Sequence, residues 1–371
     1  MNKLKKLGFL SIYLMLICSN TIFILSKGQF TWTGIIFTFL IVPLADSVLG
    51  RDSQNVSHDD FENLVHDRFF DFVVYSLVYA HFLQLVLVSF TISKADFSAF
   101  QWVGFVLSIG IFSGTMINVA HELGHRNSKI AQFHAKFTLM TVCYMHFIIE
   151  HNRGHHVWVA TPQDPATAKR GQSLYEFWVQ SIVGSFRSAW NIETQRLQRT
   201  NLLAISIYNQ MLWFVALPLL FCIAMTTFVS IVVGFWAWQV VILFFAQSIV
   251  AVLLLETVNY IEHYGIVRRE LGVGRYERVN PLHSWNANHI FSNLVLFQLQ
   301  RHSDHHAHAS RPYQVLRHFD QSPQLPFGYP VMILLALVPP IWFKTMNTRL
   351  EKWQLQAYDA QHIHQIMKQY A

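Results

Sequence analysis

Long uncharged stretches divide the chain into candidate membrane spans. Four lie in the first third of the sequence, at roughly 7–25, 30–49, 69–92 and 99–120. Each has close to the ~20 apolar residues that cross a bilayer core. A further stretch, residues 200–255, carries no charge and is too long for a single span at about 1.5 Å per residue. It therefore predicts two helices, at 207–226 and 231–258, with a turn near Thr226 and Ser230.

Other apolar pieces are too short to span. Residues 137–149 and 290–300 lie between charged or polar neighbours, which predicts helices at the membrane surface or in a cap. Residues 328–343 contain Pro330, Pro339 and Pro340, which predicts an interfacial or re-entrant segment. The first span follows three lysines but lacks a small-residue cleavage pattern, so we interpret it as a retained helix rather than a signal peptide.

This pattern predicts an all-α integral membrane protein, with residues 1–371 forming a single catalytic domain of six transmembrane helices. The composition agrees, because 53% of the residues are hydrophobic and only 13% are charged. With the N-terminus inside, the outer loops near 26–29, 93–98 and 226–230 contain only Lys27 and Lys94 of the 27 basic residues. Both termini and a cap formed by 121–200 and 259–371 are then expected on the cytoplasmic side.

Histidines cluster in the segments assigned to that cap. The clusters are HELGH (His121 and His125), EHNRGHH (His151, His155 and His156) and LQRHSDHHAH (His302, His305 and His306), and the end of the last span adds His263 in NYIEHYG. Spacings of three and four place histidines on one face of a helix. Isolated histidines are more often structural, and we expect that role for His58, His66, His81, His134, His146, His318, His362 and His364.

The number of clustered histidines limits the kind of metal site that they can form. HELGH alone would suggest a zinc protease, but a catalytic zinc takes only three protein ligands. Nine imidazoles suit two metals that each have four or five ligands and an open position. Imidazole binds iron, copper, zinc or nickel, so the ligands do not name the metal. An apolar environment without a nucleophile triad favours redox activation of oxygen, with iron as the leading candidate.

Polar side chains beside the clusters are candidates to orient the ligands. Glu122, Glu150, Glu262 and Asp304 adjoin ligands in sequence and could accept an imidazole N–H. The alternative is that they balance Arg126, Arg153 and Arg301. Glu256 and Asn259 near the end of a span are expected to face the interior, where they would either orient a metal ligand or line a channel. His283 and His289 are expected to be structural, and His308 is left without a role.

These motifs resemble those of the membrane-bound alkane hydroxylases, the alkane 1-monooxygenase family within the fatty acid desaturase and hydroxylase group. HELGHR, EHNRGHH, NYIEHYG and LQRHSDHHAH carry the resemblance, which extends from about residue 40 to residue 350. The intervening stretches ATPQDPATAKRGQS and GRYERVNPLHSWNANH also match. Arg126 stands where family members usually have lysine, and this difference keeps the charge.

The resemblance implies two irons held by the nine histidines and terminal hydroxylation of medium- or long-chain alkanes to primary alcohols with O2. It also implies electrons from a rubredoxin, itself reduced by a NAD(P)H-dependent rubredoxin reductase. The expected location is a bacterial-type inner membrane, where the bilayer supplies the alkane, and no nucleic-acid partner is expected. Arg153, Lys169 or Arg311 could contribute to a docking site for an acidic electron carrier.

Two other classes of function are consistent with parts of the pattern. A related enzyme could hydroxylate an aryl methyl group or a fatty acyl chain, or desaturate the chain. A membrane metal transporter or metal-binding protein would place its histidines along a path within the spans. The sequence does not indicate the alkane chain length, the oligomeric state or the division of the histidines between two metals.

Overall fold

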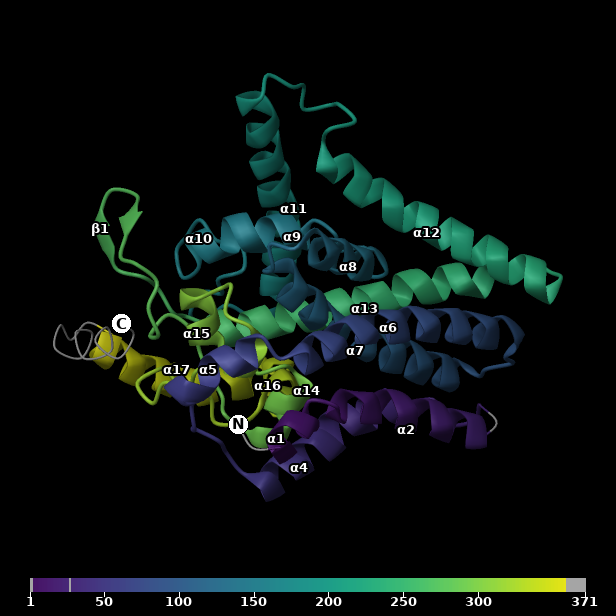
Figure 1. Ribbon diagram of the computed structural model, residues 1–371, viewed down its shortest axis with the longest axis horizontal. Helices are drawn as coiled ribbons and strands as arrows, with labels where there is room; N and C mark the ends of the chain where they lie inside the picture. Colours follow the sequence, from purple (N-terminus) through teal and green to yellow (C-terminus); the bar gives the residue numbers. More distant parts are fainter. Residues whose placement is uncertain (1–2, 27, 358–371) are drawn as a thin grey trace.

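The computed structural model describes residues 3–26 and 28–357 and is largely helical (Figure 1). Five helical stretches among these residues are long and apolar enough to cross a membrane. They are α1 with α2 (Lys3–Gly8 and Ser11–Leu25), α6 (Arg68–Lys94), α7 (Ala99–Gly124), α12 (Gln210–Val233) and α13 (Trp238–His263). Five of the six predicted spans therefore have a helix of sufficient length.

The remaining predicted span, 30–49, is shorter and irregular. It consists of α3 (Thr33–Ile36), a π-helical turn η1 (Phe37–Ile41) and α4 (Val42–Leu49). Together these form an apolar helix below the length of the other five. The sixth span thus stays a prediction.

The turn between α12 and α13 lies further along the chain than predicted. Thr226 and Ser230 remain helical, because the Ser230 hydroxyl donates to the Thr226 carbonyl at 2.7 Å. The helix ends at Gly234, whose left-handed conformation (φ 83°) lets its N–H bond to the Ser230 carbonyl. The predicted boundaries 207–226 and 231–258 are therefore wrong, and the missed signal was the glycine.

Shorter elements connect the long helices. They are α5 (His58–Val65), α8 (Lys129–Met140), α9 (Phe147–Glu150), the π-helical η2 (His151–His155), α10 (His156–Trp158), α14 (Ile290–Val295), α15 (His302–Ala307), the 3-10 turn η3 (Tyr313–Val315), α16 (Tyr329–Ala336) and α17 (Pro339–Ala357). A small antiparallel hairpin of β1 (Glu270–Gly272) and β2 (Arg275–Tyr276) departs from the all-α prediction. The long α11 (Leu174–Arg199) runs across the direction of α6, α7 and α13 (Figure 1).

The short apolar pieces fold as broken rather than continuous helices. Residues 137–149 contain the end of α8, a turn at Cys143 with φ 54°, and the start of α9. Residues 290–300 begin as α14 and turn at Phe297 and Gln298. The prolines of 328–343 stand at helix starts, where the missing N–H is tolerated, and so begin α16 and α17.

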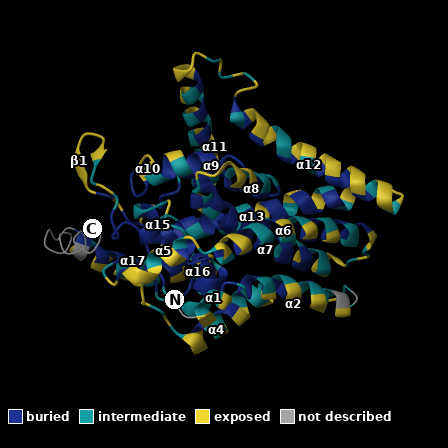
Figure 2. Ribbon diagram, viewed as in Figure 1, coloured by how far each residue is buried: buried dark blue, intermediate teal, exposed yellow. Residues whose placement is uncertain are grey.

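Helix α7 is the central element of the bundle and is largely buried, whereas α12 has many exposed positions (Figure 2). Glycines bring α7 close to α13. A Cβ added at Gly110 would lie 2.5 Å from the Cβ of Val250, and one at Gly114 would lie 2.9 Å from Leu254. Small residues four apart allow such close helix contact in membrane proteins. This packing fixes the ends of α7 and α13, from which three of the candidate ligands project.

Candidate metal centre

The nine predicted histidines converge from five parts of the chain. His121 and His125 lie at the end of α7, and His263 is the last residue of α13. The others come from η2, α10 and α15. Their nitrogens form two groups, each with all ligand atoms within 4.8 Å of one another. The first group contains His121, His125, His151, His156 and His305, and the second contains His155, His263, His302 and His306.

The Nε2 atoms of the five-histidine group form a closed ring of contacts. The sequence of neighbours around the ring is His121, His305, His156, His151, His125 and back to His121, at 2.9, 3.1, 3.0, 3.1 and 3.2 Å. Two nitrogens bound at right angles to one ion, each at about 2.1 Å, would lie about 3 Å apart. The spacing therefore fits ligands around a common metal.

Hydrogen bonding among the histidines cannot account for this ring. A ring nitrogen of neutral imidazole either donates or accepts, never both. Donors and acceptors would have to alternate around the ring, and five members cannot alternate. At least one contact would therefore pair like atoms. A central cation that accepts all five lone pairs removes the conflict, so the donor set fits a metal.

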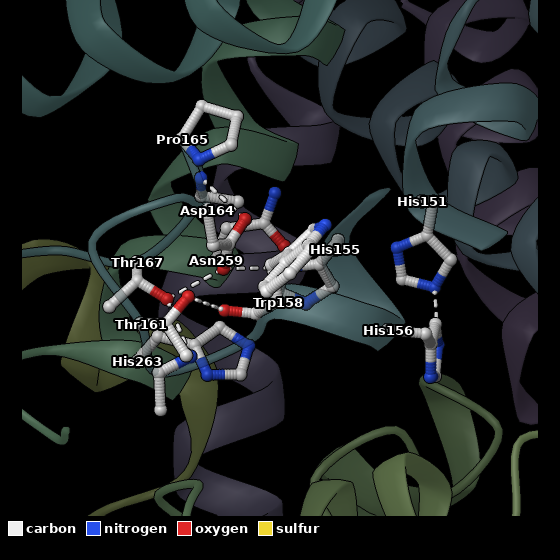
Figure 3. Close-up of polar contacts among 12 residues, drawn as sticks. His151, His155, His156, Trp158, Thr161, Asp164, Pro165, Thr167, Asn259 and His263 are labelled. Atoms are coloured by element: carbon white, nitrogen blue, oxygen red, sulfur yellow. Dashed lines mark hydrogen bonds and ion pairs between the residues drawn. The ribbon is translucent and has the colours of Figure 1, made fainter. Parts of the chain in front are cut away.

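The four-histidine group is oriented by a carboxylate that the sequence analysis did not select. Nδ1 of His155 lies 2.9 Å from Oδ2 of Asp164, and both side chains are buried (Figure 3). Donation of the Nδ1–H to Asp164 leaves the Nε2 lone pair for a ligand. That Nε2 atom is buried and has no hydrogen-bond partner within residues 3–26 and 28–357. The Nε2 atoms of the other members, His263, His302 and His306, are joined by contacts of 3.1 and 2.9 Å.

Asp164 is itself held rigidly in the loop after α10. Its Oδ2 accepts from Thr167 Oγ1 at 2.6 Å, and its Oδ1 accepts from the N–H of Ala166 at 3.0 Å. Burial alone would raise the pKa of Asp164, but the attraction of His155 and these hydrogen bonds keep it below its ordinary value. The side chain is therefore an anion suited to orient an imidazole.

The π-helical turn η2 explains how neighbouring histidines reach different groups. In an α-helix, His151 and His155 at i and i+4 would share a face. Here the N–H of His156 bonds to the carbonyl of His151, the i to i+5 pattern of a π-helix. His151 and His156 therefore meet at an Nε2 distance of 3.0 Å, and His155 turns to the other group (Figure 3).

The residues predicted to surround the ligands divide into two kinds. Glu262 lies 3.2 Å from Nδ1 of His302 and accepts from the Tyr329 hydroxyl at 2.7 Å. Glu256 accepts hydrogen bonds from Tyr144 at 2.6 Å, from Asn259 at 3.1 Å and from Ser181. Both carboxylates thus lie inside the protein beside the centre.

Two other predicted carboxylates pair with arginines instead. Glu122 bonds to Arg126 at 3.1 Å, and Asp304 bonds to Arg311. Arg301, the alternative partner considered for Asp304, donates to the Leu316 carbonyl at 2.7 Å. The buried Glu150 contacts no imidazole by a hydrogen bond in the described chain, and burial together with the charge of Asp164 raises its pKa to about 8.

The remaining histidines lie outside both groups. His283 accepts from the N–H of Asn280 at 3.1 Å and lies 3.3 Å from Glu277. His289 and His308 flank the site in sequence and belong to neither group. The same holds for the isolated histidines His58, His66, His81, His134, His146 and His318. His362 and His364 fall outside the described residues.

Burial keeps the cap histidines in the form that binds metals. It lowers the pKa of His151, His156, His302, His305 and His306 well below the ordinary value, and the neighbouring imidazoles lower it further. A neutral imidazole offers a lone pair, whereas an imidazolium does not. These five imidazoles are therefore ready to bind a cation without first losing protons. His155 differs, because Asp164 and other nearby carboxylates raise its pKa in spite of its burial.

An apolar cavity of about 60 Å³ lies within the helix bundle next to the centre. Its lining includes Gly114, Thr115 and Asn118 of α7, Leu254, Leu255 and Val258 of α13, and Val295, Leu299 and Ile333 from later segments. Asn118 stands one turn before His121, and Leu299 stands three residues before His302. Two of the lining residues therefore lie within three positions of candidate ligands, although none of the nine histidines lines the cavity itself.

A much larger groove, of about 1600 Å³, lies on the other side of η2 between α11 and the loop after α10. We call it the basic groove, because it is lined by Arg153, Lys169, Arg170, Arg187, Arg196 and Arg199. Its lining also includes Gly154, the neighbour of His155, and Asp164, the partner of His155. The groove therefore connects the protein surface to the segment that holds the ligands.

Comparison with known proteins identifies the family. Residues 99–336 match the fatty acid desaturase family. The chain is also 39% identical to alkane 1-monooxygenase 2 of Alcanivorax borkumensis, over 95% of this chain and 93% of that protein. It belongs to the alkane 1-monooxygenase family. Another alkane 1-monooxygenase 2, from Pseudomonas aeruginosa, is 41% identical over 90% of this chain and 88% of its own length.

One less similar relative is named for a different class of substrate. The xylene/toluene monooxygenase hydroxylase component of Pseudomonas putida is 31% identical over 68% of this chain and 66% of its own length. Membership of the alkane 1-monooxygenase family thus rests on higher identity over more of the chain.

Proposed function

We propose that the chain is a non-haem di-iron monooxygenase that converts medium- or long-chain alkanes to primary alcohols. One observation carries the proposal: nine buried or half-buried imidazoles converge in two groups, of five and four, at the ends of the apolar helices α7 and α13. Proteins that are about 40% identical over most of the chain are named alkane 1-monooxygenases. The nine histidines are the proposed ligands of the two irons, with one iron in each group.

The chemistry of the substrate supports a metal-dependent oxidation. A terminal methyl group has no acidic proton and no polar handle, so acid–base catalysis cannot activate it. The overall reaction consumes an alkane, O2, two electrons and two protons, and gives a primary alcohol and water. Iron bound to the histidines would supply the redox activation of O2. The protein positions the methyl group, excludes bulk water and fixes the imidazoles.

The apolar cavity is the proposed site for the end of the alkane. Its walls come from helices assigned to the membrane, so a substrate dissolved in lipid can enter without crossing water. Asn118, which lines the cavity, donates from Nδ2 to the Leu296 carbonyl at 2.7 Å, and this bond satisfies one of the two N–H groups of its amide.

The basic groove is the proposed docking site for the electron donor, a rubredoxin reduced by a NAD(P)H-dependent reductase. A positive surface attracts an acidic carrier and speeds its association. Arg153 and Lys169, selected from the sequence, both line this groove, and Arg170 and Arg187 lie with them. Arg311 does not line it and pairs with Asp304 instead, so we exclude Arg311 from the docking site.

We further propose six spans in a bacterial inner membrane, with the histidine-bearing cap and both termini in the cytoplasm. The helix Thr33–Leu49 would be the short sixth span, next to α7. An even number of spans leaves all histidine segments on one side. Their gathering at the ends of α7 and α13 disfavours a transporter, which needs ligands along a path through the membrane.

Product analysis tests the proposal against its alternatives. The membrane-embedded protein would be supplied with rubredoxin, reductase and NADH, and offered graded alkanes, toluene, xylene and a fatty acyl substrate in parallel. We expect 1-alkanols as the main products. A preference for aryl methyl groups would favour the activity named for the xylene/toluene relative, and an unsaturated acyl product would favour a desaturase.

A further inference from the structure

A second apolar space lies on the face of α13 opposite the apolar cavity. This groove of about 480 Å³ runs between α11, α13 and the turn that joins α8 to α9. Val183 and Phe186 of α11 and Phe245 and Ile249 of α13 form its walls. Its volume falls within the roughly 300–1,000 Å³ of small-molecule sites. We call it the amphiphile groove, because its walls are apolar and one of its ends is polar.

One end of the groove is polar. His146 lines it with only 7% of its surface exposed, and its Nε2 is buried without a hydrogen-bond partner in the described part of the chain. Burial lowers the pKa of His146 to about 4, so the imidazole is neutral. The nearby Tyr144 hydroxyl is already bonded to Glu256 at 2.6 Å. Because an unpaired buried nitrogen costs free energy, a ligand that bonds to His146 would be favoured.

We propose that the amphiphile groove binds a long-chain primary alcohol, with its hydroxyl on His146 and its alkyl chain between α11 and α13. The identity of this ligand as the reaction product rests on the proposed function. An alkane has no group that can bond to the imidazole. A carboxylate would be drawn to the Arg187 guanidinium, which also lines the groove, rather than to the neutral imidazole. The alcohol matches both the apolar walls and the buried, unpartnered Nε2 of the neutral His146.

The position of the groove suggests separate places for substrate and product. Ile249 and Leu253 line the amphiphile groove, whereas Leu254 and Val258 line the apolar cavity, on opposite faces of α13. Leu253 stands about one helical turn before Glu256. The exposed Val183 and Ile249 leave the groove open at its outer side, so an alcohol held there could pass into lipid.

Photolabelling tests the proposal in the full-length protein in lipid nanodiscs. A long-chain alcohol carrying a diazirine would be cross-linked without reductase or NADH, and the labelled peptides mapped by mass spectrometry. We expect label on α11 and α13 beside the groove, displaced by 1-dodecanol at concentrations where dodecane has little effect. His146→Phe keeps an aromatic ring and should weaken displacement by the alcohol about three- to tenfold, the value of one hydrogen bond.

A second pair of variants distinguishes a blocked groove from a general folding defect. Ile249→Trp fills the groove and should abolish the label, whereas Ile242→Trp, two turns earlier on the exposed side of α13, should leave it unchanged. Equal displacement by dodecane and dodecanol would overturn the proposal, as would label outside the groove. Stronger displacement by dodecanoate, lost in Arg187→Gln, would reassign the site to an anionic lipid. Binding is measured without turnover, so a failure of alkane hydroxylation is distinguishable from a failure here.

Discussion

Nδ1 of His155 lies 2.9 Å from Oδ2 of Asp164, and the two buried side chains fix the direction of the remaining imidazole nitrogen. This contact links the basic groove to the four-histidine group, because Asp164 lines the groove and His155 belongs to the group. It also shows how a carboxylate in a loop outside the histidine motifs can fix the orientation of a candidate ligand.

Replacement of Asp164 tests this contact. Asp164→Asn keeps the size of the side chain but replaces the anionic acceptor of the His155 Nδ1–H by a neutral amide, which holds the imidazole less firmly. Loss of such a partner lowers metal affinity or activity by about 10- to 100-fold. Iron content per chain and the rate of alcohol formation give the measurements. Asp320→Asn, at an exposed carboxylate beside His318, is the control and should change neither.

The division of the histidines predicts two kinds of ligand variant. His121→Ala removes a member of the five-histidine group, and His302→Ala removes a member of the four-histidine group. Each should deplete one iron preferentially, as read by Mössbauer spectra of protein loaded with a limiting amount of metal. His308→Ala, from the same segment but outside both groups, should retain two irons. Identical spectra for the two ligand variants would argue against separate sites.

The apolar cavity predicts a change in chain-length preference. Leu254→Ala on α13 enlarges the cavity beside Gly114 and should shift the preferred alkane to a longer or bulkier chain. Competition between alkanes of graded length, analysed by product mass, measures the shift. The same truncation at Leu220, exposed on α12, should leave the preference unchanged. An unaltered preference in Leu254→Ala would remove this cavity from the substrate path.

The basic groove predicts a salt-dependent interaction with the donor. Arg153→Gln combined with Lys169→Gln should raise the KM for rubredoxin by about tenfold at low salt, because steering by charge is lost. The difference from the parent protein should shrink as salt is added. Lys129→Gln, outside the groove, is the control. If the double variant kept both the KM and its salt dependence, docking would have to be placed elsewhere.

Close packing of α7 on α13 predicts a stability effect. A methyl group at Gly110 would approach Val250 to 2.5 Å and the Gln247 carbonyl to 3.1 Å. Gly110→Ala should therefore lower the free energy of unfolding by about 1–3 kcal/mol through overpacking. Thermal unfolding in nanodiscs should show a lower Tm. Gly272→Ala in the hairpin, where the added carbon meets nothing within 4 Å, should unfold as the parent does.

The sequence allowed the prediction of the histidine set but not of its division. Spacings of three and four marked the nine residues because helices present such positions together. The separation of His155 from His151 depends on the π-helical turn η2, which a periodicity of 3.6 does not reveal. Likewise, His305 contacts His121 of α7 whereas His302 contacts His263 of α13, and this division depends on the tertiary placement of α15.

Two other features were missed for different reasons. Asp164 sits in a loop, and its role depends on a fold of the chain back onto His155 that no local pattern encodes. The end of α12 was readable in principle, since Gly234 is a typical helix terminator, but the hydroxyls of Thr226 and Ser230 were given more weight. Those hydroxyls bond within the helix and do not break it.

The nine-histidine centre is proposed to insert one oxygen atom from O2 into a terminal methyl group. Its most direct test is the mass of the product formed from a medium-chain alkane under isotopically labelled O2, with rubredoxin, reductase and NADH supplied. We expect a 1-alkanol that carries one labelled oxygen atom, formed by protein that contains two irons per chain. Iron-loaded protein that forms no labelled 1-alkanol from any alkane of the series would contradict it.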